Sequence, residues 1–146
     1  MGHTSSLAFG ISLNTNKNIF CIDGDGSFIM HMGGLAVAIQ NAKDNFKYIL
    51  INNGCHESVG GEPTIAYNID IEKILLGFGF KRVYIVDNNK DLISALEYQK
   101  KNSKIAIVIN VNAKSRKDLG RPTTTPIYNK EQFQEKIRCN NESYNI

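Results

Sequence analysis

The chain has 146 residues, of which 42% are hydrophobic, and its net charge at neutral pH is +3. A chain of this length buries about two-thirds of its unfolded surface when it folds, so one domain with its own core is expected without disulfides. The apolar runs are much shorter than the roughly 20 residues of a membrane span, and the basic residues are scattered among acidic ones, so we expect a cytoplasmic protein that binds neither membranes nor nucleic acid.

The first part of the chain alternates helices and strands. Residues 5–13 mix small and apolar side chains, which indicates a helix packed closely against another element. Residues 19–22 form a short apolar run that is typical of a buried strand leading into a functional turn. Apolar side chains recur at helical spacing over residues 33–43, and residues 48–51 again have the pattern of a buried strand. Together these segments predict one βαβ unit.

The same alternation continues after a long polar loop. Residues 54–68 are rich in glycine, proline and polar side chains, and this loop is long for a compact domain, where about 4 to 6 residues is usual. The pattern then predicts helices at 70–78 and 91–101, strands at 83–86 and 105–111, and a last short helix at 130–137. Strands that alternate with helices predict an α/β fold with a mostly parallel sheet and helices on both faces.

Polar turns follow the two strands of the βαβ unit. Gly24-Asp25-Gly26 comes after the first strand and Asn52-Asn53-Gly54 after the second. Because adjacent parallel strands place their carboxyl ends side by side, we expect the carboxylate of Asp25 and the amide oxygen of Asn53 to converge on one hard cation. Magnesium takes about six oxygen ligands, often including waters and phosphates, which leaves room for a diphosphate. The two glycines of the first turn allow a close backbone approach, and Ser27 adds a hydroxyl beside it.

This pair of turns resembles the signature of the thiamine-diphosphate-dependent enzymes, in which Gly-Asp-Gly is followed after this interval by Asn-Asn. The resemblance implies a thiamine-diphosphate-binding (pyrophosphate) domain fold over residues 1–146, with thiamine diphosphate and Mg²⁺ as cofactors. It implies that Asp25 and Asn53 bind the metal through their side chains and Cys55 through its backbone carbonyl. The cofactor-binding residues that it implies are Met1, Gly24, Asp25, Gly26, Ser27, Asn53 and Ser58.

Longer blocks narrow the resemblance to decarboxylases of 2-oxo acids. They cover residues 1–6, 23–36, 52–64 and 118–126, and they resemble phosphonopyruvate decarboxylase, with the sulfopyruvate decarboxylase beta subunit close behind. The implied reaction is that of a lyase of phosphonate biosynthesis, which converts phosphonopyruvate to phosphonoacetaldehyde and CO₂. His3 and His56 favour the phosphonopyruvate branch and are the implied catalytic candidates, with His56 as a contact to the phosphonate or the transition state. Met1 would be the bulky residue under the bent cofactor.

The resemblance also implies a part that this sequence does not include. Members of the family place a pyrimidine-binding domain ahead of this region, and that domain carries the glutamate that hydrogen-bonds the aminopyrimidine ring. We therefore expect a C-terminal domain truncated at its N-terminus, a partner domain or subunit that supplies the glutamate, and association into an oligomer. Glu57, Glu62 and Glu72 are not assigned the missing role, because that glutamate comes from across a domain interface.

Simpler interpretations remain open. Turns favour Asp, Asn and Gly for conformational reasons alone, and a loop histidine is often only solvated. His31, between two methionines, is interpreted as structural, and Arg121 suits either an anionic group or a loop contact. For the whole chain, the alternatives are a non-catalytic remnant that only binds cofactor or a partner, and an unrelated nucleotide-binding module. The lack of GxGxxG and GxxxxGK[ST] motifs disfavours the second of these.

Overall fold

The computed structural model describes residues 1–114 and 117–142. The chain consists of two compact units, each with contacts mainly within itself. The first unit, Met1–Lys114, holds the strands and the helices α1 to α5. The second unit, Ser115–Ile146, holds α6 (Pro126–Glu142). Helix α6 is longer at both ends than the predicted segment 130–137. It begins at Pro126, whose fixed backbone angle and missing N–H suit the first helical position.

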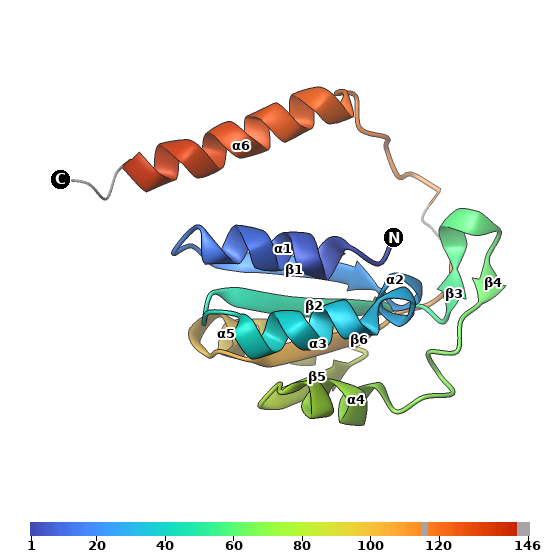
Figure 1. Cartoon of the computed structure of the whole chain (residues 1–146). Helices are drawn as coiled ribbons and strands as arrows, with labels where there is room; N and C mark the ends of the chain where they lie inside the picture. The colour runs from blue at the N-terminus through green and yellow to red at the C-terminus, as the bar shows by residue number, and fades with distance from the viewer. Residues whose placement is uncertain (115–116, 143–146) are drawn as a thin grey trace. The chain divides into compact units, whose positions relative to one another are not determined.

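The first unit is built on a parallel sheet of four strands. The strands lie in the order β1 (Ile19–Gly24), β2 (Phe46–Asn52), β6 (Ile105–Asn110) and β5 (Arg82–Val86), as Figure 1 shows. All three pairings are parallel. Strand β2 lies inside this sheet and is buried over nearly its whole length, as the apolar run of residues 48–51 predicts. The predicted α/β fold with a parallel sheet is confirmed.

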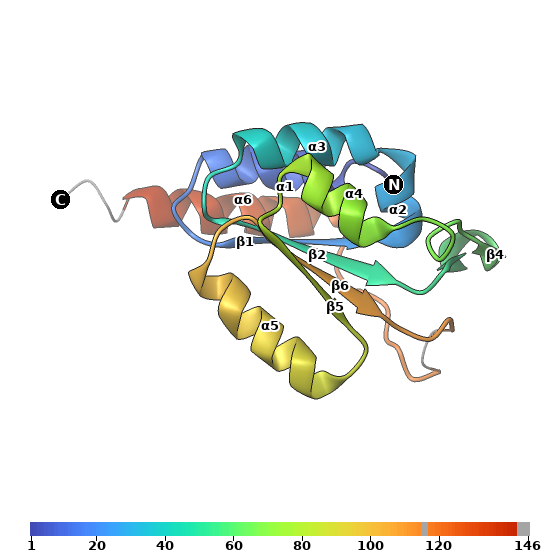
Figure 2. The ribbon, with the colours of Figure 1, turned by 90° about the horizontal axis from the view of Figure 1, so that it is seen from below.

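Helices cover both faces of the sheet. Helices α1 (Thr4–Leu13), α3 (Met32–Asn41) and α4 (Ile71–Phe78) lie on one face, and α5 (Asn89–Lys101) lies on the other (Figure 2). The first face carries the larger core, in which Tyr48 and Leu75 are fully buried. Helix α5 encloses a smaller core around Ala95 and Ile107. Two apolar layers on opposite sides of one sheet are what a doubly covered parallel sheet requires.

Two helices are preceded by a residue whose side chain caps the helix, so the local sequence determines where each helix starts. Asp70 accepts a hydrogen bond from the backbone N–H of Lys73 at 3.0 Å, and α4 begins at the next residue. Asn88 accepts one from the N–H of Asp91 at 3.0 Å at the start of α5. Such caps satisfy N–H groups that a helix leaves without partners in its first turn, and they place each helix start close to its predicted position.

Two segments differ from the expectation of irregular turns. The segment after β1 is a six-residue helix, α2 (Asp25–Met30), with an acidic side chain in its first turn, where the helix dipole favours negative charge. The long polar loop folds into an antiparallel pair of short strands, β3 (Cys55–His56) and β4 (Glu62–Pro63), around the 3₁₀ turn η1 (Glu57–Val59). Both segments lie at the carboxyl ends of β1 and β2 (Figure 1).

Within the first unit, no helix covers one face of β1. Helix α5 packs on β5 and β6, and on the same side of the sheet Phe20 and Ile22 of β1 are 40% and 60% exposed. Helix α1 also exposes Leu7. Within the described part of the chain, no helix is long and apolar enough to cross a membrane.

The larger core predicts a sharp contrast between neighbouring leucines of α4. Leu75 is fully buried, whereas Leu76 is 41% exposed. Replacing Leu75 by alanine should lower the free energy of unfolding by about 2 to 5 kcal/mol, because the removed methyl groups leave a cavity. Leu76→Ala, the matched control, should change it by less than about 1 kcal/mol. Urea unfolding of both variants measures the difference, and equal losses would contradict the assigned packing of α4.

Candidate functional site

The candidate site lies where β1 and β2 end. Gly24, the last residue of β1, pairs with Ile51 near the end of β2, so the turns after these strands are neighbours, as the sequence predicts. Asp25 begins α2 directly after β1, and Asn53 follows β2 by one residue. Parallel pairing of two consecutive strands therefore brings the two predicted metal ligands to one edge of the sheet.

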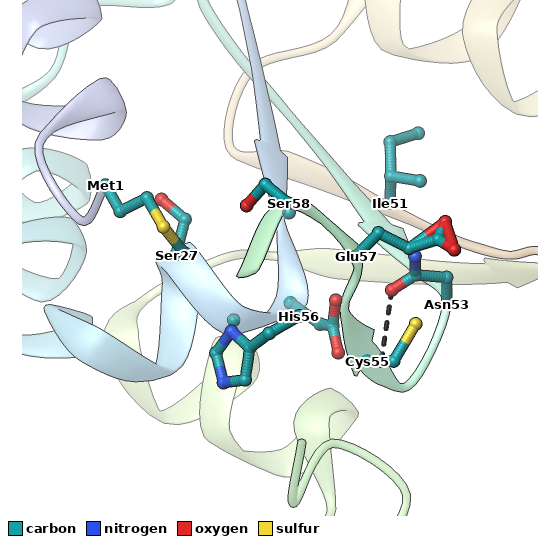
Figure 3. Close-up of a pocket in the computed structure, with 11 residues that line it drawn as sticks. Met1, Ser27, Ile51, Asn53, Cys55, His56, Glu57 and Ser58 are labelled. Atoms are coloured by element: carbon teal, nitrogen blue, oxygen red, sulfur yellow. Dashed lines mark hydrogen bonds between the residues drawn. The ribbon is translucent and has the colours of Figure 1, made fainter. Parts of the chain in front are cut away.

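A cavity of about 240 Å³ opens at this edge. Its lining residues come from the N-terminus, from α2 and from the hairpin after β2: Met1, Gly24, Asp25, Gly26, Ser27, Ile51, Asn53, Cys55, His56, Glu57 and Ser58. Every predicted cofactor-binding and metal-binding residue is among them, together with His56. Figure 3 shows Met1 and Ser27 on one side of the cavity and Asn53 and Cys55 on the other. The sequence assigned no role in the cavity to Ile51 and Glu57.

Asp25 is held by a contact that the sequence did not predict. Its side chain is only 2% exposed, and the hydroxyl of Thr64 donates a hydrogen bond to its Oδ2. Thr64 is itself placed by its backbone N–H, which donates to the carbonyl of Gly54 at 2.9 Å. The carboxylate is thus oriented by the far end of the long loop. Thr64 lies within a block that carries the family resemblance, but its spacing from Asp25 offers no local signal of the contact.

The turn after β2 is stabilised by its own asparagines. Asn53 Oδ1 accepts a hydrogen bond from the backbone N–H of Cys55 at 3.1 Å, and Asn52 Oδ1 accepts one from the N–H of Gly54 at 3.2 Å. Gly54 has φ of +69°, and a Cβ at this position would collide with the ring of Tyr67. These bonds give the turn a defined shape, which orients the amide oxygen of Asn53 and the carbonyl of Cys55.

His56 packs directly on the first turn of α2. A Cβ built on Gly26 would overlap the imidazole ring of His56, so only glycine permits this approach. The Nδ1 atom of His56 is buried and has no hydrogen-bond partner in the described part of the chain. A buried polar atom without a partner is costly, and such atoms are often satisfied by a ligand or water. His56 therefore lines the cavity and has, beside Gly26, a buried hydrogen-bonding atom without a described partner.

The N-terminal segment is tied to α2 by two hydrogen bonds. The backbone N–H of Gly2 donates to Ser27 Oγ at 2.9 Å, and the carbonyl of Gly2 lies 2.9 Å from Nδ1 of His31. The rings of His3 and His31 lie 5.1 Å apart between centroids. His3 thus packs beside His31 and does not line the cavity, whereas Met1 does. The contact of His31 with the Gly2 backbone agrees with its structural interpretation.

Burial and charge determine which groups near the site are reactive. Burial raises the pKa of Cys21 to about 12, with the charge of Asp23 acting in the same direction. Desolvation, with the charges of Glu57 and Asp25, also raises the pKa of Cys55. A thiol with a raised pKa stays protonated at neutral pH and is a poor nucleophile and metal ligand. The thiol of Cys55 is therefore a poor nucleophile at neutral pH.

The donor set suits a hard cation. Among the described residues, no group of three or more His, Cys, Asp or Glu side chains could hold a metal ion. Asp25, Asn53 and Cys55 line one cavity, and a carboxylate, an amide oxygen and a backbone carbonyl are donors that suit magnesium, which completes its shell with waters and phosphate oxygens. The residues present therefore fit a magnesium ion that also binds a diphosphate.

Comparisons with known proteins agree with this chemistry. The family model described as thiamine pyrophosphate enzyme, C-terminal TPP binding domain, matches residues 1–111. Phosphonopyruvate decarboxylase of Streptomyces viridochromogenes is 30% identical over 127 residues, which cover 86% of this chain. The chain spans only 32% of the length of that relative.

Two further proteins share the domain or its fold. The sulfopyruvate decarboxylase subunit beta of Methanocaldococcus jannaschii is 31% identical over 143 residues, covering 94% of this chain and 73% of that protein. The transketolase of Campylobacter jejuni superposes with a TM-score of 0.63 over 75% of this chain and 20% of that chain, and at 20% identity it shows a common fold. Because the family model matches most of its length, this chain belongs to the thiamine pyrophosphate enzymes and is formed largely by their C-terminal TPP-binding domain.

Proposed function

We propose that this chain is the thiamine-diphosphate- and magnesium-binding part of a 2-oxo acid decarboxylase, with phosphonopyruvate as its substrate. The products would be phosphonoacetaldehyde and CO₂, with a proton replacing the carboxylate. The observation that carries the proposal is that Asp25, Asn53 and Cys55 line one cavity at the ends of β1 and β2. The similarity to a protein named phosphonopyruvate decarboxylase supports the substrate.

In this proposal Asp25, Asn53 and the Cys55 carbonyl bind magnesium, which in turn holds the diphosphate. Asp25 contributes the only charge of the three, and its burial strengthens its attraction to a cation because little water screens it. Ser27 and the backbone at the start of α2 hold the diphosphate oxygens, since the first N–H groups of a helix have no partners within it. When bound, the cofactor supplies a thiazolium ring that accepts the electron pair left by the departing CO₂.

The remaining lining residues shape the space around the reacting atoms. Met1 and Ile51 contribute apolar surface, which reduces the water near the cofactor. His56 is the residue proposed to contact the phosphonate, because an imidazole N–H donates a hydrogen bond to such an anion. His3 does not line this cavity, so a catalytic role for it requires the N-terminal segment to move or a neighbouring chain to contribute.

A second candidate is a sulfopyruvate decarboxylase beta-type subunit. It is favoured by the relative of that name from Methanocaldococcus jannaschii, because this chain covers 73% of its length. In both candidates a pyrimidine-binding domain supplies the activating glutamate. The exposed Phe20 and Ile22 on the open face of β1 support association, since apolar side chains of this size are usually covered.

The first test is titration calorimetry of thiamine diphosphate into the purified chain. We expect binding that requires Mg²⁺ and that weakens by about tenfold or more in Asp25→Ala, because loss of a charged partner costs about 1.5 to 3 kcal/mol. Asp87→Ala, which changes an exposed carboxylate after β5, is the control and should bind as the wild type does. If Asp25→Ala bound as tightly as the wild type, this metal site would be excluded. If the folded wild type did not bind, the interpretation of the chain as a non-catalytic remnant would remain.

The second test concerns the substrate and the partner. With a chain that carries the pyrimidine-binding domain present, CO₂ release should have a higher kcat/KM for phosphonopyruvate than for sulfopyruvate. The isolated chain should release no CO₂ from either acid, because it lacks the activating glutamate. A preference for sulfopyruvate would replace the first candidate by the second, and turnover without a partner would refute the requirement for one.

The third test uses the contact between Gly26 and His56. Gly26→Ala should displace the imidazole ring and raise the KM for the 2-oxo acid about tenfold, as His56→Ala should by removing the ring. Because both changes act on one contact, the double variant should be no worse than either single one. Gly77→Ala in α4, where an added Cβ meets nothing within 4 Å, is the matched control. Additive effects of Gly26→Ala and His56→Ala would show that the two residues act separately.

A further inference from the structure

We propose a second binding site, for a phosphate group, at the edge of the sheet opposite to the cofactor cavity. A cavity of about 380 Å³ lies there between the loop before β1, the loop before β2 and the end of α5. All its lining residues have polar side chains, and the ones used here are Asp44, Asn45, Lys47, Lys100, Lys101 and Asn102. The strands are parallel, so the amino ends of β1, β2 and β6 meet at this edge.

Lys47 is the central observation. It is the second residue of β2, and its side chain is only 3% exposed although it lines the cavity. Its Nζ donates to the carbonyl of Asn102 at 2.8 Å, and no carboxylate in the described part of the chain forms an ion pair with it. Buried ammonium groups are normally paired with an anion, because removing them from water is costly. Lys47 has three N–H donors and one protein acceptor, which leaves donors for a ligand.

The surrounding charges favour an anion. Lys47, Lys100 and Lys101 line the cavity with one carboxylate, that of Asp44. Lys100 pairs with Glu97 at 2.7 Å, and the carboxyl end of α5 contributes about half a negative charge. Burial lowers the pKa of the Lys47 ammonium, with the charge of Asp44 acting in the opposite direction. The positive charge of the three lysines therefore exceeds the negative charge that the protein places around them. An anionic ligand would offset the cost of removing the Lys47 ammonium from water.

Asn45 indicates which kind of anion the cavity would bind. Its Nδ2 donates to the carbonyls of Ser12, Thr15 and Lys17, and this ties the loop before β1 to the cavity wall. Its Oδ1 is buried and has no partner among the described residues. Because Lys47 and Asn45 both line the cavity, a ligand that suits them must accept from the Lys47 ammonium and donate to the Asn45 amide oxygen. Hydrogenphosphate carries acceptor oxygens and a hydroxyl group, and a monoester such as glycerol 3-phosphate carries hydroxyl groups on its organic part, whereas sulfate lacks the donor.

This site is independent of the proposed decarboxylase, because it shares no lining residue with the cofactor cavity. The diphosphate cradle at Ser27 is, however, a second place where phosphate could bind. A test must therefore locate the bound anion as well as detect it.

The experiment is a phosphate titration of the ¹⁵N-labelled full chain, followed by amide chemical shifts, with NaCl keeping the ionic strength constant. We expect saturable shifts at Asn45, Asn102 and Ser103. Lys101→Gln, which changes an exposed side chain, and Lys47→Met should each weaken the affinity about tenfold, since a charge-assisted hydrogen bond is lost. Lys90→Gln, at the other end of α5, and Ser27→Ala should leave it unchanged.

Each outcome decides the proposal. Shifts limited to residues 24–27 would mean that phosphate binds only the cofactor cradle, and shifts that NaCl or sodium sulfate reproduces would mean ionic screening or unspecific anion binding. Retained affinity in Lys101→Gln and Lys47→Met would also overturn the site. A parallel titration with glycerol 3-phosphate distinguishes the two sources of the ligand. If glycerol 3-phosphate binds more tightly than inorganic phosphate, the ligand is a phosphate monoester. If it binds more weakly, the ligand is free phosphate.

Discussion

The parallel pairing of β1 with β2 is the constraint on which the rest of the site depends. It places Gly24 opposite Ile51, so Asp25 and Asn53 follow neighbouring strand ends although they are far apart in the sequence. Neither side chain alone would hold a divalent cation, because magnesium needs several oxygen donors at fixed distances. The sheet supplies this convergence through backbone hydrogen bonds. These bonds do not depend on the side chains of the site, which leaves those side chains available for ligands.

Close approaches between three segments then complete the cavity. The N-terminal segment is bound to α2 through Gly2 and Ser27, and the hairpin after β2 reaches α2 through His56 and Thr64. Each contact joins residues far apart in the chain, so the cavity forms only once α1, α2 and the hairpin have all packed on the sheet. A site of this kind is sensitive to small added volumes, because packed interiors relax little around an extra methyl group.

The direction of the sheet separates the chemistry of its two edges. Carboxyl strand ends bring together the oxygen donors of Asp25 and Asn53, whereas amino strand ends bring together lysines and asparagines around the buried Lys47. The open face of β1 adds a third feature, since Phe20 and Ile22 remain exposed beside a sheet whose other half is covered by α5. One relative of this chain is itself named as a subunit, the beta subunit of sulfopyruvate decarboxylase.

The sequence by itself determined the alternation of strands and helices, the parallel sheet and the neighbouring positions of Asp25 and Asn53. These features follow from apolar periodicity and from turn residues at strand ends, which are local properties of the chain. Only the tertiary structure decided that α2 begins at Asp25, that the long loop folds into a hairpin, and that His3 packs on His31 outside the cavity. The bond from Thr64 to Asp25 joins residues 39 positions apart, and the approach of His56 to Gly26 is similarly distant. No periodic pattern encodes such contacts, because they depend on how whole elements pack in space.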